Sequence, residues 1–143
     1  MESIVVGVDG SKSASSALEM AAREAALHEA QLEIVVVWQV PAAAYGGLAA
    51  LDESTAEALR EQARRVADDA LARVSQSAPP VECSTSIVNG QPAEALLAAS
   101  EGADLVVVGS RGLGGFKRLM LGSVSDQVVH HATCPVLVVR GSG

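Results

Sequence analysis

The sequence predicts a single α/β domain, residues 1–143, in which a doubly wound, mostly parallel sheet carries helices on both faces. Short apolar runs alternate with helical patterns along the whole chain, and no linker, repeat or low-complexity segment interrupts them. Such alternation implies right-handed crossovers between parallel strands. Hydrophobic residues make up 49% of the chain but aromatic residues only 2%. A core of aliphatic side chains suits a parallel sheet that is covered on both sides.

The first three elements are a strand, a helix and a strand. Residues 3–9 (SIVVGVD) form a short apolar run that ends in a turn signal, which predicts a strand. Ser11 is placed to cap the helix that follows, to about Ala30, where small apolar residues recur at helical spacing. Residues 32–39 (LEIVVVWQ) predict the second strand.

The middle of the chain continues the alternation after a loop at 40–53. Residues 54–57 (STAE) have the pattern of a capping box, and apolar spacing then predicts a long helix that ends before Pro79 and Pro80. Residues 81–88 (VECSTSIV) predict the third strand. Its mixed polarity indicates the edge of a sheet.

The last third of the chain contains two helices and two strands. Pro92 suits a first helical turn, and a short helix is expected to about Glu101. Residues 104–109 (DLVVVG) predict a central strand, because the run is apolar on both faces. Residues 123–132 predict a helix with Ser123 able to cap it, and residues 135–140 (PVLVVR) predict the fifth strand.

Charge and cysteine content narrow the classes of function. The formal charge is −7 and the isoelectric point about 4.8, which argues against a nucleic-acid backbone or an anionic membrane as the main partner. The uncharged stretch 34–51 contains Pro41 and two glycines, so a strand and a loop fit it better than a membrane span. Cys83 and Cys134 lack metal-ligand spacing, and free thiols indicate a reducing cytoplasm.

A glycine-rich basic loop follows the predicted central strand. Five glycines fall in the fourteen residues from Gly109 to Gly122, together with Arg111, Lys117 and Arg118. Glycines allow backbone N–H groups to approach a ligand, and the helix that begins near residues 122–123 adds donors and a positive dipole end. The loop therefore predicts an anion site, such as one for phosphate, at the carboxyl end of the sheet. The alternative is a solvated loop whose glycines only shape turns.

Two better-known glycine motifs do not match the first strand–helix turn, GVDGSKS. A dinucleotide fingerprint requires G-x-G-x-x-G, and a P-loop requires G-x-x-x-x-G-K-[ST]. Here Gly7 and Gly10 are too close together, and Ser11 separates Gly10 from Lys12. Asp9 would also bring a carboxylate into a phosphate cradle. Both motifs are rejected for this turn.

The glycine loop instead has the spacing G-x2-G-x9-G-[ST], with Gly109, Gly112, Gly122 and Ser123 at the fixed positions. In this spacing, and in its opening IVVGVDGS and closing CPVLVVR, the chain resembles the universal stress protein family over essentially its whole length. The resemblance implies a five-stranded sheet of order 3-2-1-4-5. It also implies ATP binding, as in the motif-bearing branch of the family, and a homodimer formed through the last strand, residues 135–140.

The resemblance also assigns roles to individual residues. Asp9 matches the acid that meets the ribose, Val37 the position whose backbone meets adenine, and Gly109 a position beside the ribose. The expected phosphate cradle consists of Gly112, Gly122, Ser123 and Val124, with Ser125 as a further candidate. Arg111 either contacts phosphate or points to solvent. Where the family often has His, this chain has Val36, next to the adenine position.

Catalytic and metal-binding groups are not evident in the sequence. Asp9 is the one acid expected near the nucleotide, and His130 and His131 are interpreted as solvated residues near a helix C-terminus. The sequence therefore predicts a cytoplasmic, nucleotide-dependent regulatory dimer that binds ATP, with Mg²⁺ carried on the phosphates. Three alternatives stay open: a slow ATPase or self-phosphorylating protein, an interaction module that binds no nucleotide, and cyclic AMP as the ligand.

Overall fold

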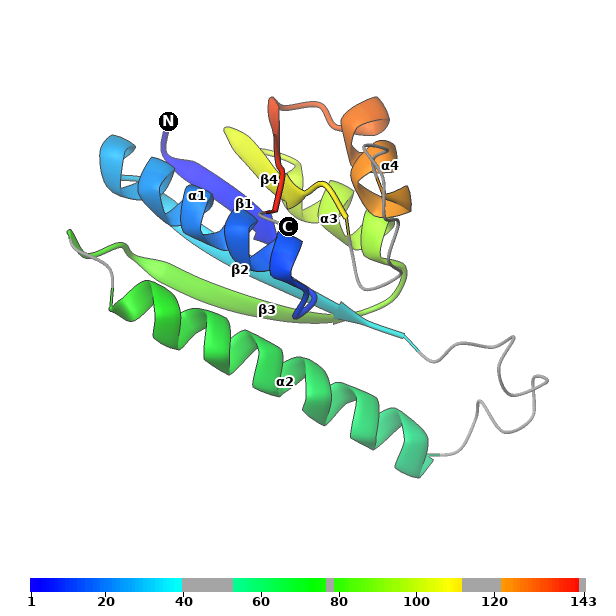
Figure 1. The fold of residues 1–143 in the computed structure, drawn as a ribbon. Helices are drawn as coiled ribbons and strands as arrows, with labels where there is room; N and C mark the ends of the chain where they lie inside the picture. The colour runs from blue at the N-terminus through cyan, green and yellow to red at the C-terminus, as the bar shows by residue number, and fades with distance from the viewer. Residues whose placement is uncertain (40–52, 77–78, 112–121, 142–143) are drawn as a thin grey trace.

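The computed structural model describes residues 1–39, 53–76, 79–111 and 122–141, and within them strands and helices alternate (Figure 1). The strands are β1 (Ser3–Gly7), β2 (Gln31–Trp38), β3 (Cys83–Asn89), β4 (Leu105–Gly109) and β5 (Val136–Val139). The helices are α1 (Lys12–His28), α2 (Glu53–Ser75), α3 (Pro92–Ser100) and α4 (Ser123–His131). The strands form one sheet of order β3-β2-β1-β4-β5, and every pairing is parallel. The predicted fold class and strand order are confirmed.

The centre of the sheet is its most apolar part. Val5 and Val6 of β1 pair with Val106 and Val107 of β4, and all four side chains are fully buried. Burial on both faces explains why these strands read as continuous apolar runs. β3 forms one edge and β5 the other, so the predictions of a central strand at 104–109 and an edge strand at 81–88 are confirmed.

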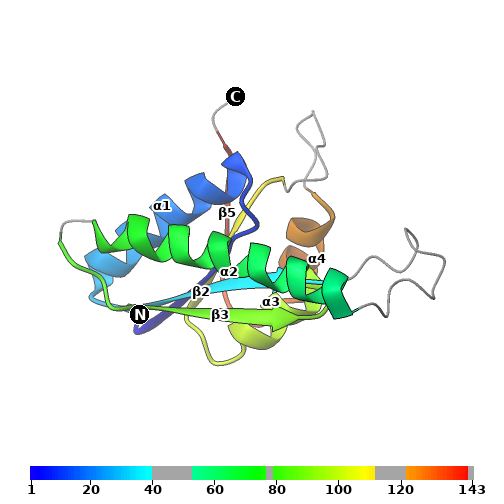
Figure 2. The ribbon, with the colours of Figure 1, turned by 90° about the horizontal axis from the view of Figure 1, so that it is seen from below.

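Two separate apolar clusters lie on the two faces of the sheet. α1 and α2 cover one face, and α3 and α4 cover the other (Figure 2). On the first face α1 buries a stripe of alanines that includes Ala17, Ala21 and Ala25. Small side chains allow the helix to lie close to the branched side chains of the strands, which fills the core without aromatic residues.

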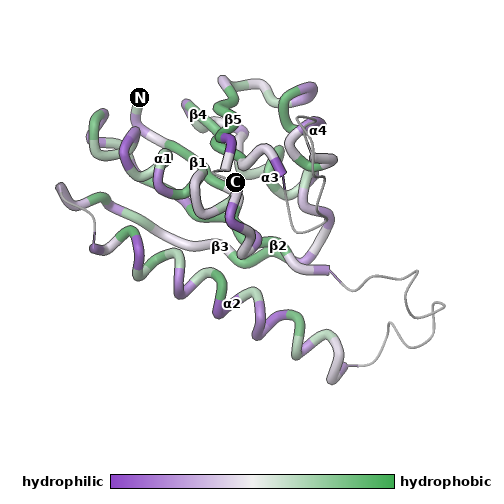
Figure 3. The backbone as a smooth tube through the Cα atoms, viewed as in Figure 1, coloured by the Kyte–Doolittle hydropathy of each residue, from purple (hydrophilic) through white to green (hydrophobic). Residues whose placement is uncertain are grey.

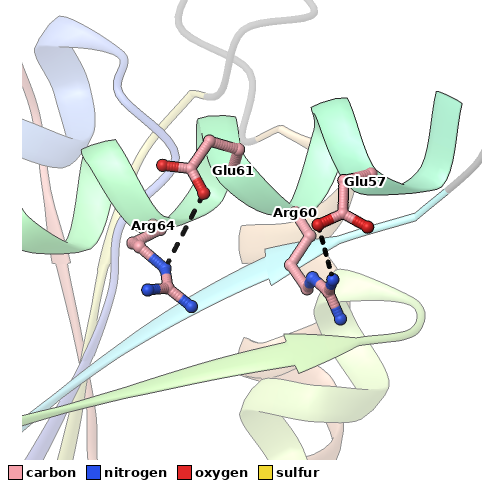
Figure 4. A network of polar contacts seen from close by, with 4 residues as sticks. All are labelled: Glu57, Arg60, Glu61 and Arg64. Atoms are coloured by element: carbon pink, nitrogen blue, oxygen red, sulfur yellow. Dashed lines mark hydrogen bonds and ion pairs between the residues drawn. The ribbon is translucent and has the colours of Figure 1, made fainter. Parts of the chain in front are cut away.

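The long helix α2 is amphipathic. It buries one stripe, Ala63, Ala67, Ala70 and Val74, with Val66 half-buried beside it, and exposes most of its polar residues. Figure 3 shows this as alternating apolar and polar segments along α2. On the exposed side Arg60 pairs with Glu57 at 3.0 Å and Arg64 with Glu61 at 3.9 Å (Figure 4). These pairs are solvated, so they add little stability and the buried stripe holds the helix in place.

The helix starts correct two predictions and confirm one. The Ser11 hydroxyl accepts a hydrogen bond from the N–H of Ala14 at 3.1 Å, as predicted for the cap of α1. α2 begins at Glu53, so Ser54 lies inside the first turn instead of at the N-cap that the capping-box pattern predicted. α4 has Gly122 at its N-cap and Ser123 as its first residue, so Ser123 does not cap the helix. The polar residue that signals a helix start need not be the N-cap itself.

At the amino end of the sheet, Asp104 links the start of β4 to the start of β1 by hydrogen bonds. Its carboxylate accepts hydrogen bonds from the N–H groups of Glu2 at 2.6 Å and Ser3 at 3.0 Å. These bonds hold the pKa of Asp104 below its usual value. Because the folded-state pKa is lowered, the contribution to stability is present above the usual aspartate pKa and is lost as the pH falls through the lowered one.

Candidate functional site

A pocket of about 280 Å³ opens at the carboxyl end of the sheet. Strands β1, β2 and β4 and the first turns of three helices contribute its walls. The lining residues are Gly7, Val8, Asp9, Ala14, Val35, Val37, Pro92, Leu96, Val108, Gly109, Arg111, Gly122, Ser123, Val124 and Ser125. Eight of the nine residues predicted from the sequence are among them. The ninth, Gly112, lies outside the described residues.

Asp9 reaches the pocket from the end of β1. The side chain is exposed, and its carboxylate accepts a hydrogen bond from the N–H of Ser11 at 2.9 Å. Gly10, with φ of +86°, takes the left-handed conformation that this turn requires. The turn leads directly into α1, so Asp9 is held at the mouth of the pocket by backbone on both sides.

Val37 and Trp38, at the end of β2, face opposite sides of the sheet. Val37 lines the pocket and packs on the α3–α4 side, whereas Trp38 is half-buried against the α1–α2 cluster. This alternation follows from strand geometry, in which successive side chains point to opposite faces of the sheet. Trp38 therefore packs against the edge of the α1–α2 core and is not part of the pocket wall.

Gly109, the last residue of β4, is fixed by close packing. A Cβ atom at this position would lie 2.8 Å from the backbone carbonyl carbon of Ser13 in α1, a distance that real structures do not tolerate. On its other side, the Gly109 carbonyl accepts a hydrogen bond from the hydroxyl of Ser125, which is 4% exposed. Only glycine allows the strand end to lie against α1 while its backbone faces the pocket.

Ser110 connects the end of β4 to two other elements. Its N–H donates to the carbonyl of Val139 in β5 at 2.9 Å, and its carbonyl accepts from the N–H of Gly122 at 2.7 Å. These two bonds fix the start of α4 to the ends of β4 and β5. The strands on the other side of the pocket, β1 and β2, come from the first part of the chain. The position of the helix N-terminus relative to the strands is thus set by backbone hydrogen bonds.

The first turn of α4 presents the anion-binding features of the pocket. Gly122 at the N-cap is buried, has φ of −67° and lacks a side chain that could cap the helix. Ser123 and Val124 follow at the pocket wall. Backbone N–H groups and the dipole at a helix start favour a negative group there. Among the described lining residues, Asp9 and Arg111 are the ones with charged side chains, so the pocket has one charge of each sign.

The sequence reasoning missed the apolar half of the pocket. It consists of Gly7, Val8, Ala14, Val35, Pro92, Leu96 and Val108. Leu96 of α3 lies over Gly7, where a Cβ atom would come within 2.8 Å of its Cδ1. Pro92 had been recognised as a helix start, and its place after β3 could have indicated that α3 begins at the same end of the sheet. An apolar wall of this kind suits the flat face of a ring.

Other candidate reactive groups lie away from the pocket. His130 is near Asp126 at 3.4 Å and His28 near Glu24 at 3.4 Å, and neither histidine lines the pocket. Within the described part of the chain, no group of three or more His, Cys, Asp or Glu side chains is arranged to hold a metal ion. In the same residues no helix is both long and apolar enough to cross a membrane.

Comparison with known proteins agrees with this architecture. The model of the universal stress protein family matches residues 1–140. A universal stress protein of Thermus aquaticus is 40% identical over 141 residues, which cover 97% of this chain and 98% of the relative. One of Mycolicibacterium smegmatis is 38% identical over 96% of this chain, but the chain spans only about half of that relative, 48% of its length.

Solved structures share the fold over nearly the whole chain. A universal stress protein family member from Burkholderia pseudomallei is 34% identical with a TM-score of 0.74, covering 96% of this chain and 95% of that one. Two more distant structures carry adenine nucleotides: a universal stress protein in complex with cAMP (24% identity, TM-score 0.73, 99% and 98% covered) and one from Arabidopsis thaliana with AMP bound (19%, 0.69, 100% and 94%). The chain belongs to the universal stress protein family.

Proposed function

We propose that the pocket at the carboxyl end of the sheet binds ATP and that the protein acts as a nucleotide-dependent regulator in a stress response. One observation carries the proposal: eight residues predicted from a sequence motif and a family resemblance, spread from Asp9 to Ser125, line a single pocket. Two structures with the same fold hold adenine nucleotides, cAMP in one and AMP in the other. Chemistry at the site fits this class of ligand.

Each part of a nucleotide has a matching part of the pocket. The Asp9 carboxylate is a hydrogen-bond acceptor for ribose hydroxyls, and the backbone of Val37 offers an edge for adenine against the apolar wall. The backbone N–H groups of Ser123 and Val124 suit phosphate at the start of α4, and Gly122, which has no side chain, lets the phosphate approach them. Arg111 adds a positive charge on that side, and Mg²⁺ would arrive bound to the phosphates.

Regulation fits the described site better than metabolic catalysis. Hydrolysis of a phosphoanhydride requires a positioned water and stabilisation of the developing charge, usually with a dedicated metal site. Asp9 is the one acid on the described pocket wall, and it is assigned to ribose. Any ATPase or self-phosphorylation activity should therefore be slow. A phosphate-release rate that scales with protein concentration and disappears in Gly122→Val would favour the enzymatic alternative.

A homodimer through β5 is part of the same proposal. Within the described residues β5 pairs with β4 on one side and has no strand on the other, and its four residues are half-buried and apolar. An isologous pairing of two such edges would cover both. Introducing a charge at Leu137 or Val139 should give monomeric or insoluble protein. A stable monomer of the parent protein in sedimentation at micromolar concentration would contradict the dimer.

Two measurements test the nucleotide proposal: the identity of any small molecule that copurifies with the protein, and the order of its affinities for nucleotides. Freshly purified protein is denatured and the released small molecules are identified by mass spectrometry. Calorimetry with ATP, AMP, cyclic AMP and GTP then ranks the ligands. We expect ATP to be released or to bind most tightly, with GTP weakest. Stronger binding of cyclic AMP would reassign the ligand, and absence of binding by all four would leave an interaction module as the function.

A further inference from the structure

We propose that Ser13 is a positioning residue for phosphate binding, because its hydroxyl holds the backbone at the start of the glycine loop. The inference rests on the proposed function, since it concerns the geometry of the same site. Ser13 is in the first turn of α1, in the sequence GVDGSKS, which is not itself a phosphate cradle. It is not among the pocket-lining residues, so it acts through a neighbour instead of touching a ligand.

The neighbour is Arg111. The N–H of Arg111 donates a hydrogen bond to the Ser13 hydroxyl at 3.1 Å, a contact between residues 98 positions apart in the chain. Arg111 is the last described residue before the loop and lines the pocket. Ser13 is 8% exposed, so water has little access to take its place as the acceptor. Arg111 is half-buried, and an N–H that is shielded from water costs free energy when it loses its acceptor, which gives the contact its value.

Ser13 lies close to the backbone of two other segments. A Cβ atom at Gly109 would come within 2.5 Å of the Ser13 hydroxyl oxygen, and one at Gly141 within 3.1 Å of the Ser13 Cα. The first turn of α1 is therefore pressed against the ends of both β4 and β5. With α1 this close to the strand ends, the Ser13 hydroxyl constrains where the Arg111 N–H can lie.

The β1–α1 turn that leads into this helix carries the ribose side of the proposed site. Asp9 accepts from the N–H of Ser11, and Ser13 follows two residues later in α1. Other hydrogen bonds from residues 109 and 110 lead to α4 and β5. The Ser13–Arg111 hydrogen bond thus links the end of β4 to the helix that follows Asp9. It sets the spacing between the sugar-binding and phosphate-binding parts of the pocket.

Ser13→Ala should change binding of phosphorylated ligands specifically. We expect the affinity for ATP and AMP to fall by about tenfold, the scale of one hydrogen bond. Adenosine, which lacks phosphate, should lose less than about twofold, because Asp9 and the apolar wall are untouched. Ser16→Ala is the matched control: it removes a hydroxyl from the same helix that bonds only locally, to the carbonyl of Lys12 at 3.3 Å. Equal losses for ATP, AMP and adenosine would overturn the proposal.

A measurement without ligand separates this proposal from the proposed function. Amide hydrogen exchange in the free protein should be faster at Arg111 in Ser13→Ala by about tenfold, and unchanged in Ser16→Ala. If the parent protein bound no ATP, the proposed function would fail, and unchanged exchange at Arg111 would separately show that Ser13 does not hold the loop. Thermal unfolding of both variants confirms that the comparison is made on folded protein.

Discussion

The first turns of α1 and α4 lie at the same end of the sheet, but side chains accept hydrogen bonds from the backbone N–H groups only at the start of α1. At α1 the chain satisfies itself: the Asp9 carboxylate accepts from the Ser11 N–H, and the Ser11 hydroxyl accepts from the Ala14 N–H. At α4 the N-cap is Gly122, which has no side chain to offer. A strand–helix turn that contains glycine is therefore a candidate anion site only where no side chain caps the N–H groups of the first helical turn. Those N–H groups can then donate to a ligand.

The largest expected effect is at the start of α4. Gly122→Val should reduce ATP affinity by about 100-fold or more, because a branched side chain would stand where phosphate must approach the backbone. The fold should persist, since φ of −67° is accessible to any residue. Isothermal calorimetry measures the affinity, and circular dichroism checks the fold.

Gly90→Val is the control for this variant. A Cβ atom at Gly90 meets nothing within 4 Å, and the residue does not line the pocket. We expect it to bind ATP as the parent does. If Gly122→Val bound ATP equally well, the first turn of α4 would not be the phosphate site, and the contrast between the two helices would lose its functional meaning.

Gly109→Ala should destabilise the fold, because it disturbs the packing of β4 against the start of α1. The new methyl group would collide with the backbone of Ser13, and the free energy of unfolding should fall by about 1–3 kcal/mol, the usual cost of overpacking. Chemical denaturation measures the change. A variant with unaltered stability would mean that β4 and α1 are not in such close contact, and that Gly109 serves the ligand alone.

Variants of Asp9 test whether a residue that accepts a hydrogen bond within the β1–α1 turn also binds a ligand. Asp9→Ala should weaken ATP binding by about 1–3 kcal/mol, the range for hydrogen bonds to a charged group. Asp9→Asn keeps an oxygen for the Ser11 N–H, so its stability should match that of the parent while ATP binding is still weakened. With 2′-deoxy-ATP the loss caused by Asp9→Ala should be smaller. Identical losses for both nucleotides would argue that Asp9 does not meet the sugar.

Much of this fold could be predicted from the sequence because its signals are local. Apolar runs of the right length marked the strands, and alanine spacing marked the face of α1 that packs on the sheet. The two cap assignments were wrong, since Ser54 is the second residue of α2 and Ser123 is the first residue of α4. Polar residues favour a whole first turn, so pattern alone does not fix the N-cap.

The polar half of the pocket could also be predicted, whereas the apolar half could not. Asp9 and the glycines belong to short motifs, and the sheet order brings them together. Leu96 and Val35 carry no chemical signal, and their place depends on how α3 packs over Gly7. Ser13 is harder still, because its partner is 98 residues away and nothing local distinguishes it from the other serines of α1.

The smallest expected effects come from a pair of serines, one at each helix start. Ser11→Ala removes the cap of α1, so stability should fall by about 1 kcal/mol while ATP affinity changes little, because the lost bond is internal. Ser123→Ala removes an exposed hydroxyl from the first position of α4, which is no cap. Stability should then hold, and ATP affinity should fall by about 0.5–1.5 kcal/mol if the hydroxyl meets phosphate. Denaturation and calorimetry on both variants form a crossed test: the α1 change should appear only in stability and the α4 change only in binding. The opposite pattern, or the same pattern in both variants, would mean that the two helix starts do not divide folding and ligand binding between them.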